Sequence, residues 1–140
     1  QIGGYAGGRR ALEAQLPERL YAARRGATDS ELLFLLALAR IEPGVPPADA
    51  MQAVLHDTQA RMAMLGIAEP LRFAAALSDG QQLLAFRFAS DDQPPSLYVG
   101  HGARGHIVAS EPLDACPEAW QSVPASSWVR VDAAGVTLHS

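Results

Sequence analysis

The spacing of apolar residues changes about halfway along the chain. In the first half, apolar residues recur at helical spacing, and from residue 71 onward they alternate with a period of two. Helices are predicted at 9–16, 18–25, 28–39 and 47–66, and strands at 71–77, 83–88, 96–99, 106–110, 127–131 and 136–139. Helices followed by strands predict an α+β fold with an antiparallel sheet, because alternating β-α-β units would mix the two patterns.

The predicted helix at 28–39 has the clearest start signal. Thr28-Asp29-Ser30-Glu31 matches the capping box, in which the threonine oxygen accepts a backbone N–H and the glutamate reaches back to the helix start. Residues 32–39 are all apolar. A helix without a polar face must be buried on most sides, so we expect this one to lie inside the protein.

The next helix has signals at both ends. Pro47 suits the first helical position, and Gly66 stands where a C-terminal cap is expected. One face carries residues at helical spacing, which predicts an amphipathic helix: Met51, Val54, Leu55, Thr58, Met62 and Leu65.

Turn-forming residues mark two other segments. Asp79-Gly80 between two alternating runs is a strong hairpin signal, and it predicts that strands 71–77 and 83–88 pair. The second strand would place Leu84, Phe86 and Phe88 on one face. Gly3, Gly4, Gly7 and Gly8 predict a loose opening before the first helix.

Composition limits the classes of function. The chain has 140 residues, of which 49% are apolar and 19% charged, as in one globular domain. The net charge is −4, and the basic clusters are two arginine pairs, at 9–10 and 24–25, expected to be exposed. Without a concentrated basic face we expect no nucleic-acid partner. Without an apolar run of about 20 residues we expect no membrane span.

Cysteine and histidine offer little chemistry. Cys116 is the single cysteine, so no internal disulfide or thiolate metal cage can form, which suits the reducing cytoplasm. We expect its thiol to be structural, since no histidine lies near it in sequence. His101 and His106 are predicted turn residues, and their spacing does not resemble a zinc site. We therefore expect no metal and no cofactor.

Asp29 is the best candidate for ligand binding. The capping box uses Thr28 and Glu31 and leaves Asp29 in the first turn, where the helix dipole favours an ionised carboxylate. A carboxylate held in this way is suited to bind an ammonium group through charge-assisted hydrogen bonds. Helix capping alone also accounts for the pattern.

Several segments resemble class II glutamine amidotransferases of the small, stand-alone kind. Residues 26–34, Gly-Ala-Thr-Asp-Ser-Glu-Leu-Leu-Phe, resemble the Gly-x-Thr-Asp-Ser-Glu-x-x-Phe segment of that family. Residues 76–80 with 86–90 are similar to its hairpin, and 108–114 with 120–124 to its closing segment. The resemblance implies an Ntn-hydrolase fold, an αββα sandwich with antiparallel sheets, of which residues 1–140 would form the C-terminal part.

The resemblance also implies a mechanism, and it places some of the site residues before Gln1 and others within this chain. An N-terminal cysteine attacks the side-chain amide of glutamine, and an Asn-Gly pair binds the oxyanion. Both are expected upstream of Gln1, as is the arginine that grips the substrate carboxylate, so this segment alone is expected to be inactive. The family's substrate-binding aspartate corresponds to Asp29, which would contact the α-ammonium group, with Thr28 in support. The N-terminal half of the same protein is then an expected partner.

Three functions remain open at this point. The substrate is either free glutamine or a γ-glutamyl compound, as in the ergothioneine-pathway amidohydrolase that the sequence resembles. The third reading is a non-catalytic binding or regulatory module that keeps the fold without the nucleophile. Formation of a homo-oligomer is also open.

Overall fold

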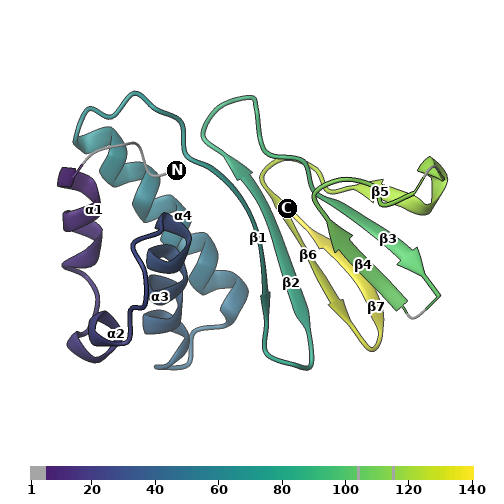
Figure 1. The fold of residues 1–140 in the computed structure, drawn as a ribbon, viewed down its shortest axis with the longest axis horizontal. Helices are drawn as coiled ribbons and strands as arrows, with labels where there is room; N and C mark the ends of the chain where they lie inside the picture. The colour runs from purple at the N-terminus through teal and green to yellow at the C-terminus, as the bar shows by residue number, and fades with distance from the viewer. Residues whose placement is uncertain (1–5, 104, 115) are drawn as a thin grey trace. The chain divides into compact units, whose positions relative to one another are not determined.

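The computed structural model describes residues 6–103, 105–114 and 116–140. The chain divides between Leu71 and Arg72 into a helical unit and a β unit (Figure 1). No helix of the described part is long and apolar enough to cross a membrane.

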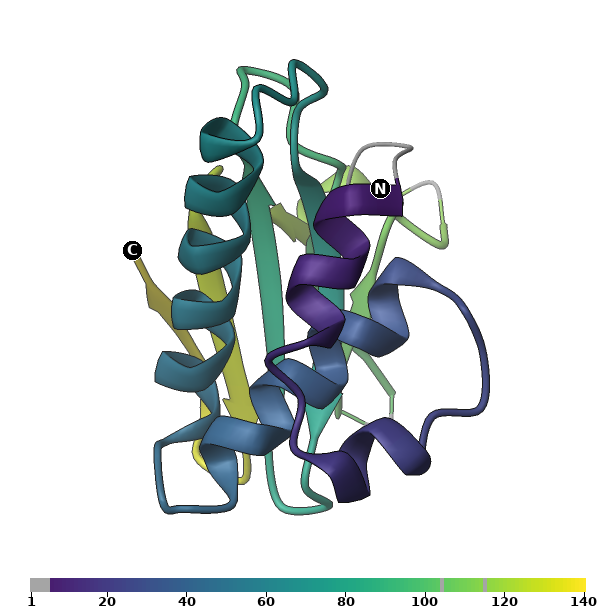
Figure 2. The same cartoon turned by 90° about the vertical axis from the view of Figure 1, so that its left-hand side faces the viewer.

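The helical unit contains α1 (Ala6–Glu13), α2 (Glu18–Ala22), α3 (Asp29–Ile41) and α4 (Pro47–Met64). Helix α3 packs against α4, and α1 and α2 also contact α3 (Figure 2). The α3 side chains at positions 32, 33, 35, 36 and 37 are buried, as the apolar run predicted. Phe34 departs from the predicted burial, because its side chain is 43% exposed.

The first two helices are shorter than predicted at their C-terminal ends. Helix α1 begins earlier, so Gly7 and Gly8 are helical rather than part of a loose opening, while Gly3 and Gly4 lie outside the described residues. After Glu13 the amides of residues 15 and 16 bond to carbonyls three residues back, which tightens the last turn before Pro17. Helix α2 ends at Ala22, and no helix forms at 23–27.

Helix α4 begins at Pro47 as predicted and ends in a Schellman motif. The N–H of Ile67 bonds to the carbonyl of Met62 at 3.0 Å, and that of Gly66 to Ala63 at 3.0 Å. Gly66 has a φ of +69°, a conformation that glycine adopts without a Cβ penalty. Leu65 was predicted on the buried face but is 51% exposed, because it is the C-cap residue beyond the last turn.

The β unit consists of two antiparallel sheets. One has four strands in the order β1 (Arg72–Ser78), β2 (Leu83–Ala89), β6 (Ser127–Asp132) and β7 (Gly135–His139). The other has three, in the order β4 (Gly105–Ala109), β3 (Tyr98–Gly102) and β5 (Trp120–Ser122). The predicted α+β class with antiparallel sheets is confirmed. Strand β5 and the 3₁₀ turn before it, Pro117–Ala119, were not predicted.

A buried apolar cluster draws on both sheets. Ala85 of β2 and Val129 of β6 are direct partners in the larger sheet, and both side chains are buried. They join Val99 of β3 and two loop residues, Leu97 and Val123. The two sheets thus share one core within the β unit.

The hairpin of β1 and β2 forms at the predicted place. Its loop comprises residues 79–82, with Ser78 paired to Leu83. The Asp79 carboxylate accepts the N–H groups of Gln81 and Gln82, both at 2.9 Å, and Gly80 has a φ of +88°. These N–H donors hold the pKa of Asp79 below its usual value, because they favour the ionised form.

His101 and His106 are strand residues rather than turn residues. They are direct partners in the pairing of β3 with β4, and their ring centroids lie 5.0 Å apart. The correction follows from the pairing, since β3 runs three residues beyond its predicted end at residue 99 and β4 begins one residue before its predicted start at residue 106. Arg104, predicted in this turn, lies outside the described residues.

Candidate functional site

Thr28 caps α3 as the sequence predicted. Its backbone is extended, with φ −83° and ψ +149°, and its Oγ1 accepts the N–H of Glu31 at 3.2 Å. This bond satisfies one of the N–H groups that the first turn of a helix leaves without an intrahelical acceptor.

Glu31 departs from the predicted capping box. Its carboxylate accepts the N–H of Arg25 at 2.7 Å and that of Gly26 at 2.8 Å, instead of the N–H of Thr28. The segment before the helix folds back over the first turn, so these two amides are the ones within reach. A Cβ on Gly26 would lie 3.3 Å from the Glu31 carboxylate, which is tight. Glu31 thus fixes the segment that leads into α3.

Asp29 is the first residue of α3, and its side chain is 31% exposed. Its Oδ1 lies 3.3 Å from Nη1 of Arg9, a residue of α1. The same Nη1 donates to the carbonyl oxygen of Ala27 at 2.5 Å. One guanidinium therefore contacts both the carboxylate and the backbone just before the helix.

Arg9 belongs to a larger ion-pair network. Its Nε donates to Oε1 of Glu13 at 2.9 Å, and Nη1 of Arg24 donates to the same oxygen at 2.5 Å. The Arg24 guanidinium also lies over the ring of Tyr21, 4.6 Å from its centroid. The network connects α1, α2 and the segment that precedes α3.

This network corrects the prediction of two exposed arginine pairs. Arg9 and Arg24 have side chains only 22% and 25% exposed, whereas Arg10 and Arg25 are exposed. One signal could have revealed Arg9, because it lies four residues before Glu13 on a predicted helix and such pairs meet. No local signal indicated the contact between Arg9 and Asp29.

The start of α3 therefore presents a carboxylate suited to a cationic ligand, and it carries no thiol. It presents an acidic group at the positive end of a helix dipole, held by a basic side chain. Cys116, the one thiol, lies in the β unit and is exposed. Among the described residues, no three His, Cys, Asp or Glu side chains are placed to hold a metal ion.

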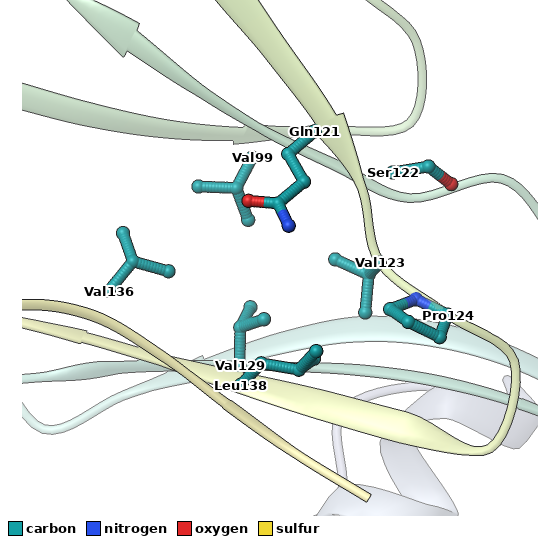
Figure 3. A pocket seen from close by; sticks show the side chains of 8 residues that line it. All are labelled: Val99, Gln121, Ser122, Val123, Pro124, Val129, Val136 and Leu138. Carbon is teal, nitrogen blue, oxygen red and sulfur yellow. The ribbon is translucent and has the colours of Figure 1, made fainter.

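The β unit contains a small pocket between its sheets. Figure 3 shows the side chains that line it, most of them apolar: Val99, Gln121, Ser122, Val123, Pro124, Val129, Val136 and Leu138. No ionisable side chain lines this pocket, so it offers no acid, base or nucleophile.

Comparison with solved structures finds a protein of similar fold. The chain is similar to a solved structure of a glutamine aminotransferase class-II domain protein from Silicibacter pomeroyi, with 32% identity and a TM-score of 0.89. The similarity covers 100% of this chain and 64% of that one. The chain has a class II glutamine amidotransferase-like fold. No protein-family model and no curated protein matches the sequence.

The similarity confirms the predicted resemblance at the level of the fold. It does not test the roles of Asp29 and Thr28 or the relation to the ergothioneine-pathway enzyme, which stay predictions. The chain spans 64% of the length of the solved structure.

Proposed function

We propose that the protein is a class II glutamine amidotransferase or amidohydrolase, and that this chain is the C-terminal part of its catalytic domain. The observation that carries the proposal is the structural similarity over the whole chain, with 32% identity to a glutamine aminotransferase class-II domain protein. The position of the Thr-Asp-Ser-Glu sequence at the start of α3 supports it.

Asp29 binds the α-ammonium group of the substrate in this proposal. An ionised carboxylate is stabilised at a helix N-terminus, and its hydrogen bonds to an ammonium group are charge-assisted. Thr28 acts in support, because its hydroxyl caps the helix and keeps Asp29 in the first turn. Free glutamine and γ-glutamyl compounds present the same α-amino acid group, so Asp29 serves either substrate.

The nucleophile is an N-terminal cysteine that precedes Gln1. Its thiolate forms a bond to the γ-carbonyl carbon, and an Asn-Gly pair, also before Gln1, stabilises the oxyanion. The carbon–nitrogen bond then breaks as the leaving nitrogen takes up a proton, which gives ammonia from glutamine or an amine from a γ-glutamyl compound. Water displaces the thiol and releases glutamate. The N-terminal part of the protein is thus the partner of this chain.

Steady-state kinetics of the protein expressed from its complete coding sequence test the proposal. Glutamate release is measured with glutamine and with γ-glutamyl conjugates of sulfur-containing compounds, which separates the two substrate classes. We expect Asp29→Asn to raise KM roughly 10- to 100-fold, as the loss of a hydrogen bond between charged groups implies, and to change kcat much less. Asp49→Asn is the matched control, since Asp49 is an exposed carboxylate in the first turn of α4.

Two outcomes contradict parts of the proposal. An unchanged KM for Asp29→Asn removes Asp29 from the substrate site. If the parent protein releases glutamate from neither substrate class, the proposed activity is wrong, and a non-catalytic module with the same fold becomes the better account.

A further inference from the structure

We propose that Arg9 is a positioning residue that holds the Asp29 carboxylate in place for the substrate ammonium group. This inference rests on the proposed function and extends it to a residue outside the Thr-Asp-Ser-Glu sequence. Arg9 lies on α1, 20 positions before Asp29, so the contact depends on how the helices of this unit pack.

The geometry of the guanidinium supports a positioning role. Nη1 lies 3.3 Å from Asp29 Oδ1 and donates to the Ala27 carbonyl at 2.5 Å, which fixes the backbone two residues before the carboxylate. Nε donates to Glu13 at 2.9 Å on the far side. Glu13 thus fixes the guanidinium through Nε, and the guanidinium fixes the start of α3 through Nη1.

Because the Arg9 side chain is mostly buried, direct contact with substrate explains its role less well than positioning does. Its side chain is only 22% exposed, and Nε and Nη1 both point at groups of the protein. The planar fork of an arginine serves three such acceptors at fixed angles, which a lysine ammonium on a flexible stem does not reproduce. Arg9 therefore acts on substrate through Asp29.

Loss of the Arg9 charge and loss of its positioning contact are expected to change KM in opposite directions, which makes the positioning role testable. Removing a positive charge beside Asp29 would, by Coulomb attraction alone, strengthen the binding of an ammonium group and lower KM. Removing a positioning contact would let the carboxylate adopt other rotamers and raise KM. The sign of the change therefore distinguishes the two effects.

The test compares arginine variants of the protein expressed from its complete coding sequence. We expect Arg9→Gln to raise KM for the hydrolysed substrate about 5- to 20-fold, with kcat changed about 2-fold or less. Arg9→Lys keeps the charge but loses the fork, so its KM should lie between those of the parent and Arg9→Gln. Arg10→Gln is the matched control, because this neighbour on α1 is exposed, and its KM should equal that of the parent.

A double-mutant cycle with Asp29→Asn completes the test. If Arg9 acts through Asp29, then Arg9→Gln should raise KM no further in the Asp29→Asn protein. Additive effects in the double variant would overturn the positioning role.

The remaining outcomes separate this inference from the proposed function. A KM that is unchanged or lowered in Arg9→Gln, together with a raised KM in Asp29→Asn, overturns the positioning role and leaves the proposed function intact. A parent protein without activity overturns both. If circular dichroism shows Arg9→Gln to be unfolded, Arg9→Lys decides: a parental KM, or failure of this variant to fold as well, overturns the positioning role.

Discussion

Gly100 of β3 lies against the indole ring of Trp120 of β5, in a space that excludes any side chain. The two residues are direct partners in the pairing of these strands. A Cβ at position 100 would lie 2.7–2.8 Å from three carbon atoms of the ring. The ring has little freedom to move away, because its Nε1 donates to Asp114 Oδ1 at 3.0 Å. A glycine is therefore required at this point of the smaller sheet.

We expect Gly100→Ala to lower the free energy of unfolding by about 1–3 kcal/mol, the usual cost of overpacking. Gly102→Ala is the comparison, since a Cβ there would meet Ile107 Cδ1 at 2.9 Å, the end of a side chain that can change rotamer. The fall in the free energy of unfolding should be clearly smaller for Gly102→Ala than for Gly100→Ala. Urea denaturation of both variants measures the difference, and equal losses would contradict the role of the indole ring.

Thr28→Ala should destabilise the protein by about 1 kcal/mol, because α3 loses the side-chain acceptor for the N–H of Glu31. Thr28→Ser keeps that acceptor and should recover most of the loss. Thermal or urea unfolding followed by circular dichroism provides the measurement. If the serine variant were as unstable as the alanine variant, the hydroxyl would not be the stabilising group.

Asp79→Asn should remove an acid-sensitive part of the stability of the hairpin. Backbone N–H groups of Gln82 and Gln81 hold the folded-state pKa of Asp79 below its usual value of 3.8. The ionised carboxylate therefore contributes stability that is complete above that value and is lost as pH falls below it. Unfolding measured from about pH 6 to about pH 2 should show a smaller decline in Asp79→Asn than in the parent. Asp92→Asn, at an exposed carboxylate in the loop after β2, should retain the parental decline.

Cys116→Ser should leave glutamate release unchanged. The thiol is exposed in the loop before β5, and its backbone N–H bonds to Asp114 Oδ1 at 3.1 Å, a bond that serine preserves. The measurement is kcat/KM of the protein expressed from its complete coding sequence. Loss of activity in this variant would identify Cys116 as part of the reaction and would contradict a nucleophile that precedes Gln1.

The elements predicted correctly have signals that are local in sequence. Thr28 and Glu31 lie three residues apart and together mark the start of α3, and Asp79-Gly80 specifies its turn almost alone. Strand β5 has only three residues, too few to show a period of two, and it exists because Trp120 and its neighbours pair with β3. Pairing of this kind depends on residues distant in sequence, so no local pattern predicts it.

The candidate site likewise contains one residue with a local sequence signal and one without. Asp29 was identified by a motif of adjacent residues, whereas Arg9 was assigned to an exposed pair. The contact between them depends on the packing of α1 and on the irregular segment 23–28, where the Glu31 carboxylate accepts the N–H groups of Arg25 and Gly26. Hydrophobic periodicity carries no information about such a segment.

The two amides that Glu31 binds tie the segment before α3 to the first turn of that helix. Arg25 and Gly26 have no regular secondary structure of their own, so their N–H groups gain protection from exchange with solvent only once the first turn of α3 brings the carboxylate to them. We therefore expect the segment and the helix start to open and close as one cooperative unit. An event that frays the first turn of α3 would release Asp29 and the residues that lead into it together.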